Sequence, residues 1–144
     1  MRPALWDNIF FLRKLYDRSL EPVCQKYKLT RMELDVLLFL DNHPAFDTAT
    51  EIVERRKLAK SHVSISVKTL ERRRYLERLY LDGNRKTAHL RLLPLAREAV
   101  EEGQAAQRDF FGTVFQNFTE EEQAAFERAL SRIAQNVRGA CEQG

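Results

Sequence analysis

The stretch "KSHVSISVKTLERRRYLERLYLDGNRKTAHLRLL", residues 60–93, changes its apolar spacing partway along. Residues 60–74 carry apolar side chains at steps of three and four, which is the spacing of one face of a helix. Residues 75–81 and 86–93 read as strands, and the second of them alternates apolar with polar side chains. Between them "DGN" at 82–84 supplies turn residues. The stretch therefore predicts a helix followed directly by an antiparallel β-hairpin.

Three further helices are predicted before this stretch. Residues 5–27 carry apolar side chains at helical spacing, which indicates a long first helix. Thr30 with Glu33, and Thr48 with Glu51, each match the capping box that opens a helix. The helix after Thr30 is apolar nearly all round and should be buried.

Two more helices are predicted after the hairpin. Pro94 suits the first turn of a helix, because the N–H groups of that turn have no partner within the helix and proline lacks one. The apolar pattern of this helix then runs to about Asn117. Thr119 with Glu122 opens the last helix. The stripe on that helix consists of Phe126, Leu130, Ile133 and Val137. The predicted fold class is mainly α with a small antiparallel β-hairpin.

Charge is distributed unevenly along the chain. Residues 54–91 hold 12 Lys or Arg against 4 Asp or Glu, a net charge of +8, whereas the rest holds 12 against 17, or −5. A basic segment between acidic flanks fits a nucleic-acid site, and it equally fits a solvated face. Charge by itself leaves both interpretations open.

Several other classes of protein find little support in the composition. No apolar run approaches the roughly 18 residues of a membrane span, and residues 1–18 lack a signal-peptide pattern, so a cytoplasmic protein is expected. Cys24 and Cys141 lie far apart and are expected to be reduced thiols. The three histidines lack the spacing of a helical metal pair. With no phosphate-cradling glycine loop and no Ser-His-Asp setting, neither enzymatic activity nor a cofactor is predicted.

The order of these elements is that of a winged helix-turn-helix, in which the second helix enters the DNA major groove. Residues 29–96, and "KSHVSISVKTLERRRYLER" above all, resemble the MarR family of bacterial transcription regulators. The resemblance implies one MarR-like domain over residues 1–144. Its DNA-binding lobe would span 29–93, and the dimerisation helices would span 1–28 and 94–144.

The resemblance also implies a function. It suggests a homodimer, most simply a repressor, that binds a pseudo-palindromic operator in double-stranded DNA and is released by a small-molecule effector. The effector pocket would lie between the dimer helices and the DNA-binding lobe. Leu12, Tyr16, Val23, Tyr27 and Phe39 are candidates to line it, although each fits an ordinary core position better. The identity of any effector is not predicted.

This sequence departs from the family pattern at several positions. Ala59 stands where a polar cap is frequent, Ile65 where an arginine is common, and Arg74 where a glycine often closes the helix. The wing reads "NRK" where Asp-x-Arg is typical. An arginine at position 65 would be a natural reader of guanine, so these departures affect base preference more than fold.

The candidate DNA-binding residues fall into two groups. On the predicted recognition helix they are Ser61, His62, Ser64, Ile65 and Lys68. At the hairpin tip they are Arg85 and Lys86, cations suited to the negative potential of the minor groove. The helix group could also be the polar, solvent-facing side of an ordinary helix, and the cations at the hairpin tip could simply keep a turn soluble. Two rival functions remain open as well: a winged helix that docks an acidic protein, and an architectural DNA binder without sequence preference or effector.

Overall fold

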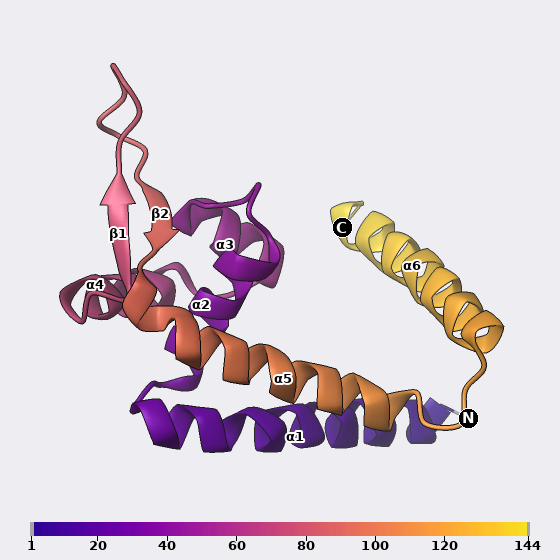
Figure 1. The fold of residues 1–144 in the computed structure, drawn as a ribbon. Helices are drawn as coiled ribbons and strands as arrows, with labels where there is room; N and C mark the ends of the chain where they lie inside the picture. The colour runs from indigo at the N-terminus through magenta and orange to yellow at the C-terminus, as the bar shows by residue number, and fades with distance from the viewer. Residues whose placement is uncertain (1, 144) are drawn as a thin grey trace. The chain divides into compact units, whose positions relative to one another are not determined.

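The computed structural model describes residues 2–143, and the side chains of residues 4–143. Its elements in chain order are α1 (Arg2–Tyr27), α2 (Arg31–Asn42), α3 (Ala49–Arg56), α4 (Lys60–Arg72), β1 (Leu76–Leu79), β2 (His89–Leu92), the 3₁₀ turn η1 (Pro94–Ala96), α5 (Arg97–Val114) and α6 (Glu120–Glu142) (Figure 1). The predicted class, mainly α with one antiparallel hairpin, is confirmed. The chain divides into two compact units, residues 1–110 and 111–144.

Helix α2 forms the centre of the first unit. As its sequence predicted, it is buried nearly all round, and its apolar residues from Leu34 to Leu40 are inaccessible or almost so. Helix α5 approaches it closely at Gly103, where an added Cβ would lie 2.9 Å from Leu38 Cδ2. Helices α1 and α5 lie antiparallel, since Lys26 pairs with Glu102 at 2.5 Å and the Gln107 amide donates to the Tyr16 hydroxyl at 2.9 Å.

The predicted helix starts are confirmed, with one change in detail. At α2, the Thr30 hydroxyl accepts from the Glu33 N–H and the Glu33 carboxylate accepts from the Thr30 N–H, so the capping box is complete. At α3, the Thr48 hydroxyl accepts from the Glu51 N–H, but it also donates to the Glu51 carboxylate at 2.9 Å. That carboxylate is thereby engaged, and the predicted capping box is only half formed.

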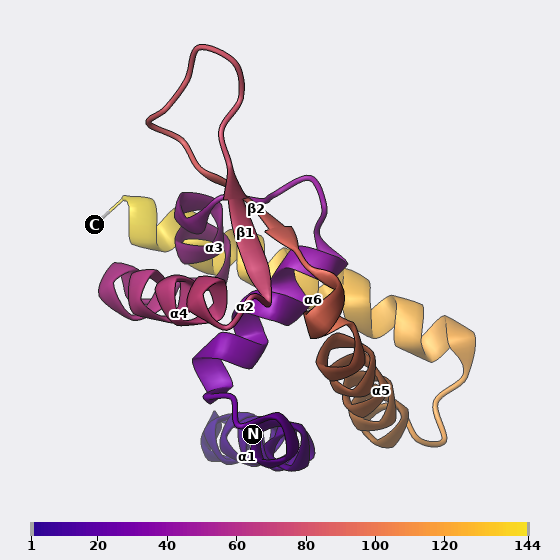
Figure 2. The same cartoon turned by 60° about the vertical axis from the view of Figure 1, so that its left-hand side comes forward.

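The hairpin has shorter strands than its sequence suggested. Strands β1 and β2 pair over four residues each, from Leu76 opposite Leu92 to Leu79 opposite His89, and residues 80–88 form a loop that projects from the sheet (Figures 1 and 2). The reason lies in Asn84, whose side-chain oxygen accepts from the N–H groups of Lys86 and Thr87. Those two N–H groups are therefore not available to lengthen the backbone hydrogen-bond ladder between β1 and β2.

The hairpin is tied to the loop before α3 at its base. The Leu90 N–H donates to the Asp47 carbonyl at 2.7 Å, and Thr48 forms an isolated antiparallel bridge with His89. The His89 Nδ1 also lies 2.8 Å from an Asp47 carboxylate oxygen. These contacts attach the base of the wing to the helix-turn-helix from both backbone and side chain.

Helix α4 ends in a Schellman motif that contains no glycine. The Tyr75 N–H donates to the Leu70 carbonyl at 2.9 Å, and the Arg74 N–H donates to the Glu71 carbonyl at 3.0 Å. Arg74 itself has a φ of 60°, in the left-handed region that favours glycine. The departure noted in the sequence at position 74 therefore places a strained residue at the end of α4.

The neighbouring Arg73 points into the protein and caps α1. Its guanidinium donates to the carbonyls of Lys28 at 2.8 Å and Tyr27 at 2.7 Å, and it stacks on the Tyr75 ring 4.7 Å away. Those carbonyls belong to the end of α1, where the helix dipole favours a positive charge. Arg73 thus links the first helix of the chain to the end of α4.

The second unit consists mainly of α6. The Thr119 hydroxyl accepts from the Glu122 N–H, as the sequence predicted. Phe115 makes edge-to-face ring contacts with Phe118 and Phe126. Helix α5 begins after the 3₁₀ turn at Pro94 and ends at Val114, slightly before the predicted Asn117. Within the part of the chain that the structure describes, no helix is long and apolar enough to cross a membrane.

We expect Arg74→Gly to stabilise the protein by about 0.5–1 kcal/mol, because glycine adopts the left-handed conformation at lower cost. Chemical denaturation measures the change in the free energy of unfolding. Lys68→Gly is the matched control: Lys68 is also exposed but lies inside α4, so its replacement should cost about 1 kcal/mol. Loss of stability in Arg74→Gly would contradict the strain argument.

We expect Arg73→Ala to lower the free energy of unfolding by about 2 kcal/mol, because two carbonyls lose a charged donor. Arg72→Ala is the control one residue away. Arg72 is exposed, and its guanidinium donates to the Thr69 hydroxyl at 3.3 Å, so its loss should stay within about 0.5 kcal/mol. Equal effects of the two substitutions in the same denaturation experiment would exclude the capping role.

Candidate nucleic-acid interface

Helix α4 has one buried face and one exposed face. Val63, Val67 and Leu70 are at most 2% exposed and pack towards α2 and α3, and the polar Ser66 is buried with them. At about 100° per residue, the positions farthest from that face are 61, 65, 68 and 72. The packing of α4 therefore fixes which side chains reach solvent along its whole length.

The structure brings most of the predicted helix residues onto the outer side of α4. Ser61, Ile65 and Lys68 form its outermost stripe and are exposed, and His62 is exposed on the flank. Ser64 is partly buried on the other flank. Arg72 continues the outermost stripe one turn beyond Lys68 and was absent from the predicted set. Projecting the apolar residues of α4 onto a helix, at about 100° per residue, would have identified Arg72 from the sequence.

Helix α4 begins without a side-chain cap. Ala59 takes the N-cap position with no side-chain hydrogen bond, and the exposed side chains of Lys60 and Ser61 follow it. The first N–H groups of the helix carry partial positive charge and lack a side-chain acceptor there. The departure at position 59 therefore leaves this end of α4 electrostatically favourable to an anion such as a phosphate.

The preceding turn holds α3 and α4 in their relative positions. Lys57 adopts φ of 53°, and the Leu58 N–H donates to the Val53 carbonyl at 3.3 Å. Within α3, the Arg55 guanidinium stacks 3.6 Å from the ring centroid of Phe46. The conformation of Lys57 turns the chain between the two helices, which lie side by side in Figure 2.

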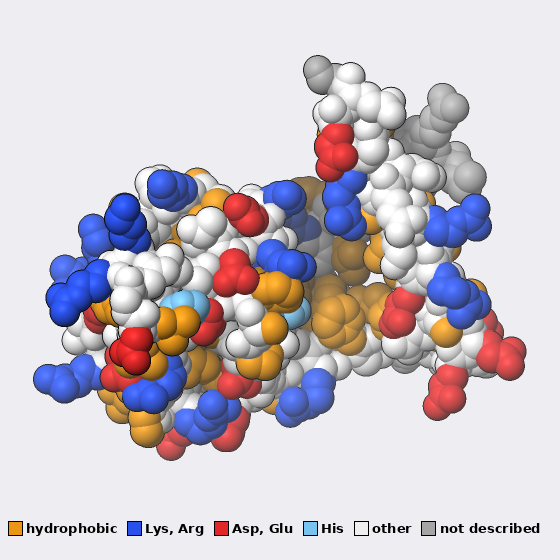
Figure 3. All heavy atoms as spheres, turned by 90° about the horizontal axis from the view of Figure 1, so that it is seen from above, with side chains coloured by type: hydrophobic (Ala, Val, Ile, Leu, Met, Phe, Trp, Pro, Cys, Tyr) orange, Lys and Arg blue, Asp and Glu red, His pale blue; other side chains and the backbone are white. Residues whose placement is uncertain are grey.

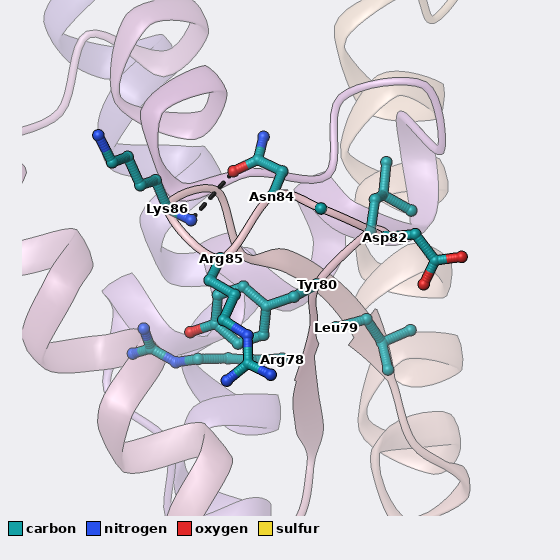
Figure 4. A pocket seen from close by; sticks show the side chains of 9 residues that line it. Arg78, Leu79, Tyr80, Asp82, Asn84, Arg85 and Lys86 are labelled. Atoms are coloured by element: carbon teal, nitrogen blue, oxygen red, sulfur yellow. Dashed lines mark hydrogen bonds between the residues drawn. The ribbon is translucent and has the colours of Figure 1, made fainter.

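The wing presents its cations on an ordered loop. A turn closed by the Asn84 N–H and the Leu81 carbonyl at 3.0 Å places Gly83 at φ of 78°, and Asn84 then binds the backbone beyond Arg85. Arg85 and Lys86 are both exposed. They extend in different directions, Arg85 towards Arg78 of β1 and Tyr80, the first residue of the loop (Figure 4).

Positive charge surrounds α4 and the wing. Lys and Arg side chains gather at the left of Figure 3, the side on which Figure 1 shows these elements. Arg78 and Arg91 are each paired with a carboxylate: Arg78 lies 3.3 Å from that of Glu71, and Arg91 pairs with Glu77 across the strands. The exposed positive charge thus exceeds the acidic charge on this part of the first unit.

The residues suggested for an effector pocket differ in how deeply they are buried. Val23 and Phe39 are buried in the core, Tyr16 and Tyr27 pack against it, and Leu12 is 47% exposed. Tyr16 and Phe39 do line a common polar cavity, but its volume is about 30 Å³, which suits a water molecule.

The Cys24 thiol is buried in the core. Its burial raises the pKa of the thiol, which favours the protonated form.

Comparisons with known proteins agree with this geometry. The sequence model of the MarR family matches residues 27–84. The HTH-type transcriptional regulator PecS of Dickeya dadantii is 28% identical over 129 residues, which cover 85% of this chain and 75% of PecS.

Solved structures show the same fold. The transcriptional regulator PA3341 superposes with a TM-score of 0.80 at 21% identity, covering 96% of this chain and 99% of that one. A MarR family regulator from Listeria monocytogenes, solved in complex with 26mer DNA, gives a TM-score of 0.78 at 16% identity, with 92% and 87% covered. Residues 27–84 thus match the MarR family in sequence, and most of the chain has the fold of solved regulators that include a MarR family member.

Proposed function

We propose that this protein is a sequence-specific DNA-binding repressor that acts as a homodimer on a pseudo-palindromic operator. The observation that carries the proposal is the outermost stripe of α4, in which Ser61, Ile65 and Lys68 are exposed beside a wing that carries Arg85. A helix with such a stripe fits the major groove, whose base edges differ for every base pair. As transcriptional regulators, proteins of this family are not enzymes.

The two parts of the interface have different roles in the proposal. Ser61, His62 and Ser64 carry short or pivoting groups that reach base edges, and Lys68 suits a phosphate or a guanine. Arg85 and Lys86 lie at the end of a narrow loop that follows the duplex to the adjacent minor groove, where a cation is favoured. Because the base of the wing is tied to the loop before α3 through Asp47, the two contacts have a fixed spacing.

Dimerisation is supported by the helices that flank the DNA-binding lobe. In the single chain, α1 exposes several large apolar side chains: Leu5, Trp6, Ile9, Phe10, Phe11 and Leu12. Helix α6 likewise exposes Phe126, Leu130, Ile133 and Val137. Contiguous exposed apolar surface of this kind is unfavourable in water and is typical of an interface. We therefore assign residues 1–28 and 94–144 to dimerisation and residues 29–93 to DNA binding.

The proposal includes relief of repression by a small molecule. Its support is the set of polar links between the flanking helices and the lobe. Arg73 binds the end of α1, and Asp41 of α2 accepts from Arg97 at 3.1 Å and Gln104 at 2.5 Å on α5. A ligand that displaced α1 or α5 would act on α4 through these links.

The deciding experiment is selection of duplexes by the purified protein from a random pool, followed by competition with a scrambled duplex. The proposal expects an enriched two-fold symmetric sequence that the scrambled duplex does not displace. Equal binding of both duplexes would indicate an architectural DNA binder. Absence of binding would favour a winged helix that docks an acidic protein.

We expect a dimer at micromolar concentration, because the exposed apolar surfaces of α1 and α6 need a partner. Light scattering measures the mass in solution. Leu130→Glu with Ile133→Glu should shift the mass towards a monomer, whereas the double substitution of the exposed Arg132 and Arg138 by Glu keeps the stripe intact and serves as the control. A monomer mass for the parent protein would overturn the assignment.

We expect Lys68→Ala and His62→Ala to weaken binding in different ways. Loss of a phosphate contact at position 68 should lower affinity evenly across sequences, whereas loss of a base contact at position 62 should relax preference at one base pair per half-site. The expected size is about 1–3 kcal/mol for a good base contact. The measurement is the affinity for the selected operator and for all its single-base variants. An unchanged ranking in His62→Ala would show that His62 does not read a base.

We expect Arg85→Ala to weaken operator binding with almost no change in melting temperature, because Arg85 is exposed at the loop tip. A dimer loses two cations, so the slope of log affinity against log salt should decrease by roughly two units. Lys86 replaces part of the lost charge, which makes the double variant Arg85→Ala, Lys86→Ala the stronger test. The same salt slope in the double variant and the parent would mean that the wing does not contact DNA.

A further inference from the structure

Ile65 stands apart from the other large apolar side chains of α4. Val63, Val67 and Leu70 are at most 2% exposed, but Ile65 is 63% exposed. It lies in the middle of the outermost stripe, one turn after Ser61 and one turn before Lys68. Any surface that covers the outer side of α4 must therefore cover Ile65.

We propose that Ile65 determines sequence specificity by contacting the C5-methyl group of a thymine in each operator half-site. The inference rests on the proposed DNA-binding function and adds the identity of one base. It follows from what the side chain offers: Ile65 has neither a donor nor an acceptor, and the thymine methyl is the one apolar group at the base edges of the major groove. Against any other base the side chain would desolvate a polar edge without replacing its hydrogen bonds.

The conformation of α4 favours such a contact. Isoleucine is branched at Cβ and holds one strongly preferred χ1 rotamer inside a helix, so the position of its methyl groups is largely set by the backbone. The backbone is fixed in turn by the buried face of the same helix. Ser61 and Lys68, on either side, provide the hydrogen-bonding groups that place the helix over adjacent positions.

The test uses the duplex selected by the full-length protein and replaces its thymines, one symmetric pair at a time, by deoxyuridine. This replacement removes the methyl group and preserves base pairing. Burial of one such group corresponds to an affinity change of about fourfold. One symmetric pair of thymines should therefore show a loss of roughly tenfold or more, because the dimer makes the contact twice.

Substitutions then assign the effect to Ile65. In Ile65→Ala the difference between thymine and deoxyuridine at that pair should disappear, and in Ile65→Val it should decrease but persist. Ile65→Arg should select guanine in place of thymine, since arginine pairs with the guanine edge. Lys68→Ala is the control: it should bind both duplexes more weakly and keep their ratio. Melting temperatures confirm that each variant is folded.

The outcomes separate this inference from the proposed function. If the parent protein binds its selected duplex equally well with deoxyuridine at every thymine, or if Ile65→Ala retains the parent's ratio, the assignment of Ile65 is overturned while sequence-specific binding stands. If selection enriches no sequence, the proposed function itself fails, and the assignment fails with it.

Discussion

The burial of one face of α4 is the constraint on which the interface depends. Val63, Val67 and Leu70 pack towards α2 and α3, and burying side chains of this size contributes about 1.5–3 kcal/mol each. Rotating the helix to expose a different face would forfeit that energy. The orientation of Ser61, Ile65 and Lys68 is thus a consequence of core packing, although none of the three contributes to the core.

The end of α4 and the base of the wing are held by contacts that the spacing of apolar residues in the sequence does not specify. Arg73 binds carbonyls at the end of α1, more than forty residues earlier in the chain. At the other end of the lobe, His89 and Leu90 attach the wing to Asp47. These links mean that α1, the helix-turn-helix and the wing move as connected parts, so a displacement of the flanking helix would reach the recognition surface.

The wing illustrates how one polar side chain changes a local structure. The sequence alternation over residues 86–93 suggested a strand that begins soon after the turn. Asn84 instead engages the N–H groups of Lys86 and Thr87, and the loop from 80 to 88 remains outside the sheet. The consequence is a longer projection with Arg85 at its tip, held by a turn rather than by strand pairing.

The sequence by itself determined the order and type of the elements, the fold class, the buried face of α4 and the start of every helix with a threonine cap. These features depend on local periodicity and on groups within three or four residues of one another, as with Thr30 and Glu33. Only the tertiary structure decided the role of Arg73 among three consecutive arginines and the attachment of His89 to Asp47. Each of these depends on which partner comes within about 3 Å, and that distance is set by the packing of the whole chain rather than by neighbouring residues.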